Sequence, residues 1–171
     1  MKRLAGFLDR GASNPIIRNS TTAGLYDTTK VGPATAVKVG PSDYRMWYEA
    51  IKDDGGATTS VGYATSTDGT TWTKSGSNPI VSPNVAPDWE QNEVSPVSVV
   101  FDPFTGKWRM WYHGGHNAGP RAIGHMESTD GITSWSRYGS NPVLQKGAAS
   151  AWDETFVADA KVIIMSATDY R

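Results

Sequence analysis

The amino-acid sequence predicts an all-β protein, and three observations lead to that prediction. First, the chain repeats itself: Tyr44–Tyr48 returns as Trp108–Tyr112, and Gly62–Gly69 returns as Gly124–Gly131. Second, the 171 residues include 18 glycines, 10 prolines, 7 tryptophans and 7 tyrosines, a composition typical of short strands and tight turns. Third, no window of eleven or more residues places apolar side chains at the i, i+3, i+4 and i+7 positions of a helix.

The repeat has a period near 64 residues and extends toward both ends of the chain. Ser13–Ile16 matches Ser77–Ile80 and Ser140–Val143, and Asp169–Arg171 stands 126 positions after Asp43–Arg45. Self-similarity at a fixed period indicates one supersecondary unit that is repeated. We therefore expect a single domain over residues 1–171, with complete units at about 30–83 and 93–146 and a unit split between 1–17 and 154–171.

Each complete unit contains four short strand candidates separated by turn residues. In the second unit we expect them at Val94–Phe101, Lys107–His113, Ala122–Ser128 and Ser134–Arg137. The first unit repeats this scheme from Val31 to Lys74. At the ends of the chain we expect a lone fourth strand at about Gly6–Asp9 and a first strand within Phe156–Arg171.

Four antiparallel strands in a radially repeated unit describe one blade of a β-propeller. The tryptophans and tyrosines of the second and fourth strands are expected to fill the space between neighbouring blades, because one sheet cannot bury both of its faces alone. The sequence thus predicts a partial ring, with two full blades and split end blades.

The blade sequences resemble those of carbohydrate-active enzymes. Arg-Met-Trp-Tyr, then Ser-Thr-Asp-Gly-x-x-Trp, then Asn-Pro-Ile/Val is similar to the blade pattern of five-bladed propeller glycosidases. The families concerned are the clan with glycoside hydrolase families 32, 43, 68 and 62, and the family 130 phosphorylases with their relatives. The resemblance covers residues 14–171 and implies a β-propeller with a carbohydrate-directed activity. The turn also resembles the Asp-box of sialidases, but it lacks the residue between Asp and Gly.

Charge and composition exclude several other classes of protein. With 16 basic and 17 acidic residues, the chain has no field that attracts nucleic acid or an anionic membrane, and we expect neither as a partner. No cysteine is present, which excludes disulfides and thiolate metal sites. Met1–Asp9 is too short for a signal peptide as it stands, so we expect a cytoplasmic protein. We expect no cofactor and no metal site.

The two ends of the partial ring are complementary, which predicts self-association. Unpaired sheet edges are an aggregation hazard, so one chain's C-terminal strand is expected to join the N-terminal strand of a second copy. Twofold symmetry would make the two junctions equivalent. We therefore expect a homo-oligomer, specifically a dimer.

An aromatic residue followed by an acid stands at the start of every unit. The three pairs are Tyr26-Asp27, Trp89-Glu90 and Trp152-Asp153. Because the first strand of each propeller blade lines the central channel, these residues are candidates for substrate binding, with the aromatic rings stacked on sugars. The alternative is architectural, because a feature that recurs in all three units is suited to bracing each blade.

Positions that differ between equivalent units are better candidates for function. Glu93 stands where the other units have Lys30 and Phe156. It is the candidate acid, because a channel with apolar walls would raise its pKa. Asp159 lies in Val157–Val162, which resembles the Arg-Asp-Pro motif of the family 32 enzymes with alanine on both sides of the aspartate. That resemblance implies that Asp159 binds sugar hydroxyls and stabilises the transition state.

The remaining candidates follow the second strand of the second unit. His113 and His116 flank a Gly-Gly pair, and the first unit has Glu49 in place of His113. Both histidines are candidates for contact with a ligand, although no third metal ligand stands nearby and ordinary loop histidines are the alternative. Arg121 is a candidate for substrate binding, and the alternative role of Glu93 is an ion pair with Arg121 or Lys30.

These features predict a glycosidase-like protein whose site lies at the mouth of the propeller channel. Glycoside hydrolysis needs two carboxyl groups, and we expect Glu93 and Asp159 to supply them. A noncatalytic propeller that binds a glycan or a protein is one alternative. An inactive truncated fragment is the other.

Overall fold

The computed structural model describes residues 14–85, 88–116 and 119–171. These residues contain strands and turns and no helix, which confirms the all-β prediction, and therefore none of them forms a helix that spans a membrane. The strands are β1 (Lys30–Gly40), β2 (Asp43–Lys52), β3 (Thr58–Ser66), β4 (Thr73–Lys74), β5 (Glu93–Asp102), β6 (Lys107–Gly115), β7 (Ala122–Ser128), β8 (Ser136–Arg137), β9 (Ile164–Ser166) and β10 (Asp169–Tyr170).

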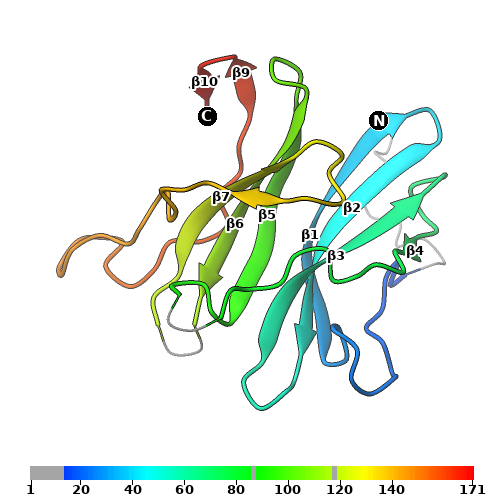
Figure 1. Ribbon diagram of the computed structural model, residues 1–171, viewed down its shortest axis with the longest axis horizontal. Coiled ribbons are helices and arrows are strands. Elements are labelled where there is room, and N and C mark those ends of the chain that lie inside the picture. The colour runs from blue at the N-terminus through cyan, green and yellow to red at the C-terminus, as the bar shows by residue number, and fades with distance from the viewer. Residues whose placement is uncertain (1–13, 86–87, 117–118) are drawn as a thin grey trace, which may run out of the picture.

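Two antiparallel four-stranded units make up most of the structure. β1, β2, β3 and β4 pair in that order, and β5, β6, β7 and β8 repeat the same order. Figure 1 shows the two units side by side, with β5–β7 to the left of β1–β3. One parallel bridge, between Thr59 and Glu93, joins them. The sheets have the form of successive propeller blades, and the described residues do not close a ring.

The strand boundaries follow the sequence prediction closely in the second unit. The third strand, Ala122–Ser128, was predicted with the bounds that β7 has, and β5 and β6 are each slightly longer than expected. The fourth strand is shorter, because only Ser136 and Arg137 pair with β7. The lone strand expected at Gly6–Asp9 lies outside the described residues.

The C-terminal segment differs from its prediction. We expected a first strand from Phe156 onward, but regular pairing starts only at Ile164, in the two-stranded sheet of β9 and β10. Before that point the segment is held by isolated hydrogen bonds, such as the one from the Val157 amide to the Arg121 carbonyl at 3.4 Å. The Val162 amide donates to Ser98 Oγ at 3.1 Å, which fixes the segment beside β5 without a ladder.

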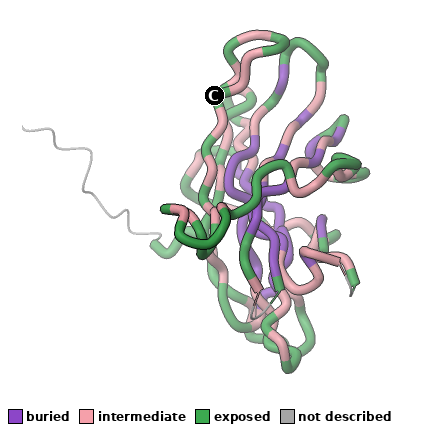
Figure 2. The backbone as a smooth tube through the Cα atoms, turned by 90° about the vertical axis from the view of Figure 1, so that its left-hand side faces the viewer, coloured by how far each residue is buried: buried purple, intermediate pink, exposed green. Residues whose placement is uncertain are grey.

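The main core lies between the two blades. Trp47 of β2 is fully buried, and its ring centroid lies 5.0 Å from that of Trp108 of β6 and 5.5 Å from that of Tyr63. Val99 and Met110 join the same cluster from the second blade. Figure 2 shows this buried zone in purple along the middle of the strands. The aromatic residues therefore fill the interblade space, as predicted from the repeat.

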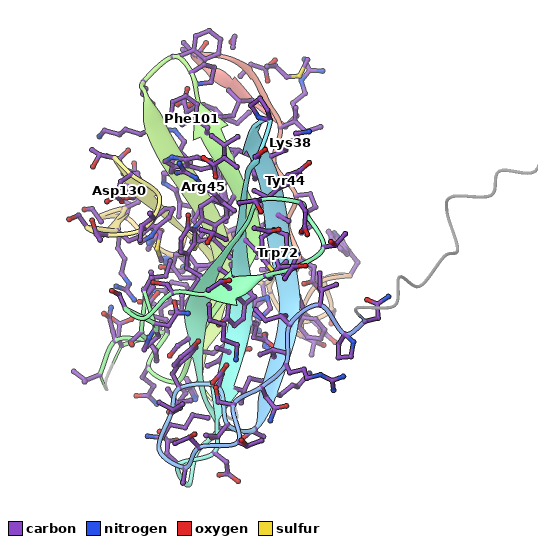
Figure 3. The ribbon with its side chains drawn as sticks, turned by 90° about the vertical axis from the view of Figure 1, so that its right-hand side faces the viewer. Lys38, Tyr44, Arg45, Trp72, Phe101 and Asp130 are labelled. Carbon is purple, nitrogen blue, oxygen red and sulfur yellow. The ribbon has the colours of Figure 1, made fainter. Side chains whose placement is uncertain are left out.

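Hydrogen bonds across the interface fix how the blades face each other. The Trp47 indole donates to the Gly131 carbonyl at 2.7 Å, and Arg45 Nη1 donates to the Asp130 carbonyl at 3.3 Å. Figure 3 shows Arg45 pointing toward the turn that contains Asp130. Both acceptors belong to the Ser-Thr-Asp-Gly turn of the second blade. The repeated turn is thus part of the contact between blades.

The turn itself is built by side chains that bond to nearby backbone. In the first blade, Asp68 Oδ1 accepts from the amides of Thr70 and Thr71 at 2.7 Å each, and Gly69 adopts a left-handed φ of 77°. A residue with a Cβ is strained in that conformation. Asp130 and Gly131 repeat the arrangement in the second blade, which explains why both repeats keep the same four residues.

Candidate functional site

A pocket of about 650 Å³ opens where β1 and β5 begin, and we call it the channel pocket. Lys30 and Glu93 enter it from the first residues of β1 and β5, and Glu49 enters it from β2. Arg121, Lys146 and Glu154 complete the charged part of its lining. In a propeller the first strands of neighbouring blades line the central channel, and this pocket lies where the first strands of the two blades begin.

Glu93 is the carboxylate of the channel pocket that contacts both Arg121 and His113. Its Oε2 accepts from Arg121 Nε at 2.8 Å, and its Oε1 lies 3.2 Å from His113 Nε2. Burial acts to raise the pKa of Glu93, but the hydrogen bonds from His113 and Arg121 outweigh it and leave the pKa below its usual value. The raised pKa that we expected from an apolar channel is therefore wrong. The ion pair with Arg121, the alternative considered from the sequence, is present.

Glu49 is a site residue that the sequence analysis did not select. Its side chain is buried, with 7 % of the residue exposed, and Oε2 accepts from Ser95 Oγ of the second blade at 2.7 Å. Gly32 makes room for it, because a Cβ at that position would overlap Glu49 Oε1. The signal was available in the repeat: Glu49 and His113 are equivalent positions with different residues, which is the criterion that selected Glu93.

His113 lies between Glu93 and Asp159, the two carboxylates proposed as a pair from the sequence. It is 7 % exposed, with Nε2 toward Glu93 and Nδ1 4.0 Å from Asp159 Oδ1. Asp159 itself is open to solvent, with 76 % of its side chain exposed, and has a left-handed φ of 56°. His116 lines the channel pocket from the loop after β6. Five predicted residues thus lie in or beside one pocket: Glu93, His113, His116, Arg121 and Asp159.

Three other predicted residues lie inside the blades and not in the channel pocket. Asp27 and Glu90 are fully buried and form ion pairs with Lys74 and Arg137, the cations of the outermost strands β4 and β8. Trp89 stacks on Tyr112 with ring centroids 5.9 Å apart. These contacts fit the architectural alternative, in which an acid at the start of the first strand ties it to the last strand of the same blade.

The third aromatic-acid pair is placed differently. Trp152 is 96 % exposed, and Asp153 forms no ion pair within the described residues. Neither side chain lines the channel pocket, but the three residues that follow them do: Glu154, Thr155 and Phe156. Trp152 therefore presents an open indole face at the edge of the segment that borders the pocket.

The fold is shared with glycoside hydrolases of known structure. No protein-family model matches this sequence, and no curated protein is similar to it. One matching structure comes from the glycoside hydrolase family 130 of mannoside phosphorylases, a family that contains hydrolases that target β-1,2 mannosidic linkages in Candida mannan. It matches with a TM-score of 0.63 at 18% identity over 84% of this chain. A family 117 glycoside hydrolase of Zobellia galactanivorans matches with a TM-score of 0.63 at 17% identity over 76% of the chain.

A plant enzyme extends the likeness. Fructan 1-exohydrolase IIa of Cichorium intybus matches with a TM-score of 0.53 at 19% identity over 67% of this chain and 21% of its own length. The family 130 and family 117 matches cover 42% and 43% of their own chains, so this chain spans about two fifths of their length. At these identities the likeness concerns the fold alone. The chain therefore has the architecture of part of a β-propeller of the glycoside hydrolase kind, in agreement with the resemblance seen in its sequence.

Proposed function

We propose that this chain is a glycosidase-like, carbohydrate-active propeller whose glycan binds in the channel pocket. The observation that carries the proposal is the meeting of carboxylates from two blades, Glu93 of β5 and Glu49 of β2, where β1 and β5 begin. The fold shared with glycoside hydrolases supports a sugar as the ligand, and the pocket volume of about 650 Å³ suits a ligand of one or two sugar rings.

The arrangement of charges suggests a role for each predicted residue that lies in or beside the channel pocket. Arg121 and His113 both contact Glu93, so Glu93 fits the ionised member of the carboxyl pair that glycoside hydrolysis requires. Asp159 is exposed beside His113, where it is free to accept hydrogen bonds from sugar hydroxyls. His116 and Arg121 line the same pocket and complete the binding surface.

The test is the turnover of aryl furanosides and aryl pyranosides by the full chain. Glu93→Gln keeps the shape of the side chain and removes its charge, so we expect hydrolysis to fall at least about a hundredfold. Glu127→Gln is the matched control, because Glu127 pairs with Lys107 outside the channel pocket and turnover should stay unchanged. Equal activity of the Glu93→Gln variant and the natural chain would rule out hydrolysis through Glu93.

The exposed indole of Trp152 favours a second candidate function, the noncatalytic binding of a glycan. Sugar rings stack on open aromatic faces, and this ring is almost fully accessible. In that case Glu93→Gln should retain glycan affinity, while Trp152→Ala should weaken it roughly tenfold in a calorimetric titration. A chain that neither binds nor hydrolyses any glycan would be the inactive fragment considered from the sequence.

We also propose that the chain forms a homodimer. The described sheets end in unpaired edges, and the first strand of a third unit is present in β9 without a complete blade around it. A second copy is the partner that the repeat predicts.

A further inference from the structure

Three potential metal ligands meet in the channel pocket. Glu49, Glu93 and His113 each offer one ligand atom, and these atoms all lie within 4.8 Å of one another. They come from β2, β5 and β6, so two blades contribute to the cluster. No short spacing in the sequence indicates such a group, because the three residues are separated by 20, 44 and 64 positions and only the pairing of the strands brings them together.

Glu49 is a buried carboxylate that forms no direct ion pair within the described part of the chain. It is 7 % exposed, and its polar contact is the Ser95 hydroxyl at 2.7 Å. Buried charges in proteins are paired with an opposite charge or coordinate a metal ion. The Ser95 bond holds Oε2, while Oε1 lies against Gly32, where the missing Cβ leaves space. The carboxylate is thus held in place, and the nearby Arg121 charge acts on it without forming an ion pair with it.

His113 is buried, and its two ring nitrogens face different carboxylates, Nε2 toward Glu93 and Nδ1 toward Asp159. Its Nδ1 is buried and has no hydrogen-bond partner within the described residues. Its Nε2 lies 3.2 Å from Glu93 Oε1. Two ligand atoms bound to one tetrahedral zinc ion lie about 3.3 Å apart, because each bond measures about 2.0–2.2 Å. This pair therefore already has the spacing of two ligands on one metal ion.

We propose that Glu49, Glu93 and His113 bind a zinc ion. Zinc accepts imidazole nitrogen and carboxylate oxygen together, whereas calcium prefers oxygen ligands alone. The supporting contacts are also present: Arg121 holds Oε2 of Glu93, and Ser95 orients Glu49. The metal ion would take the place of the hydrogen bond that now joins Glu93 Oε1 and His113 Nε2. With three protein ligands, the fourth position is open to water or to a sugar hydroxyl. The inference goes beyond the proposed function, because it holds whether or not the chain hydrolyses glycosides.

The test is metal binding by the full chain after dialysis against a chelator. Zinc should bind at one ion per chain by elemental analysis, and at a hundredfold excess over its Kd it should raise Tm by roughly 5 to 10 °C. Cobalt(II) bound in the same place should give the visible absorption of a tetrahedral ion. Calcium should leave Tm unchanged. None of these measurements depends on glycoside turnover, so a chain without hydrolase activity still tests the proposal.

Variants locate the ion. Glu49→Gln and His113→Ala should each weaken zinc binding at least tenfold, while the chelator-treated variants keep the circular dichroism of the natural chain. Glu49→Gln retains the volume of the side chain and an oxygen that accepts from Ser95, so of the two variants it disturbs the fold less. His125→Gln removes a histidine outside the cluster and should leave zinc binding intact. The proposal is overturned if zinc binds all variants equally, if calcium is preferred, or if no zinc binds.

Discussion

At the scale of single residues, Asp102 shows how much one buried carboxylate stabilises a blade. It is fully buried, and it accepts from Arg109 Nε at 2.7 Å, the Phe104 amide at 2.9 Å and the Tyr170 hydroxyl at 3.1 Å. Asp102→Asn leaves the longer contact with Glu127, at 3.7 Å, as the only ion pair of Arg109 within the described residues, so we expect the free energy of unfolding to fall by about 3 kcal/mol in urea titrations. Asp43→Asn, which breaks a more exposed aspartate–arginine pair, should cost at most about 1 kcal/mol.

The same residue makes stability depend on acidity. Burial acts to raise the pKa of Asp102, but the bonds from Arg109, Thr105, Phe104 and Tyr170 outweigh it and hold the pKa well below its usual value. A carboxyl with a depressed folded-state pKa stabilises the protein above its unfolded pKa of about 3.9, and this stability is lost as the pH falls further. The stability of the natural chain should therefore decline below about pH 4, and Asp102→Asn should flatten that decline.

The candidate site shows which of its residues could be identified from the sequence and which could not. Glu93 was found because it differs from Lys30 and Phe156 at equivalent positions of the repeat. Its partner Arg121 lies 28 positions away, and only the pairing of β5, β6 and β7 brings them together. Glu49 was not predicted because the expected site residues stand at the starts of the first strands, whereas Glu49 reaches the channel pocket from the C-terminal part of β2.

At the scale of elements, Trp47 is the side chain on which the contact between the blades depends most. Trp47→Phe removes the bond to the Gly131 carbonyl and leaves space beside Trp108, so we expect a loss of about 2–3 kcal/mol. Trp72→Phe is the matched control. Its indole bonds to Gly69 of its own turn at 3.2 Å and is less buried, so the loss should stay below about 1 kcal/mol. Equal losses in urea titrations would contradict this ranking.

Most elements were predictable because their signals are local. The turns around Asp68 and Asp130 and the alternation along β6 and β7 need only a few neighbouring residues to form, and their bounds were predicted closely. Residues 156–163 carry the same apolar pattern as a strand, but a strand forms only where a neighbour accepts its hydrogen bonds. Such a neighbour is a property of the assembled sheet, so the sequence alone did not reveal that pairing begins at Ile164.

At the scale of the whole molecule, the expected homodimer is tested by multi-angle light scattering. The chain should elute with twice the 18.4 kDa mass of one copy. The physical reason is the cost of leaving the edges of β1 and of the β9–β10 sheet without partners. A monodisperse species at the mass of one chain would refute the dimer, and it would leave the two-blade structure itself unchanged.

The single bridge between Thr59 and Glu93 has a consequence for any ligand held there. It is the point where the two sheets are joined by backbone pairing, and Glu93 is both its second member and a pocket carboxylate. Glu49 stands on β2 and Glu93 on β5, and Ser95 of β5 already bonds to Glu49 at 2.7 Å. A ligand that touches both carboxylates would therefore tie the two blades together at a further point.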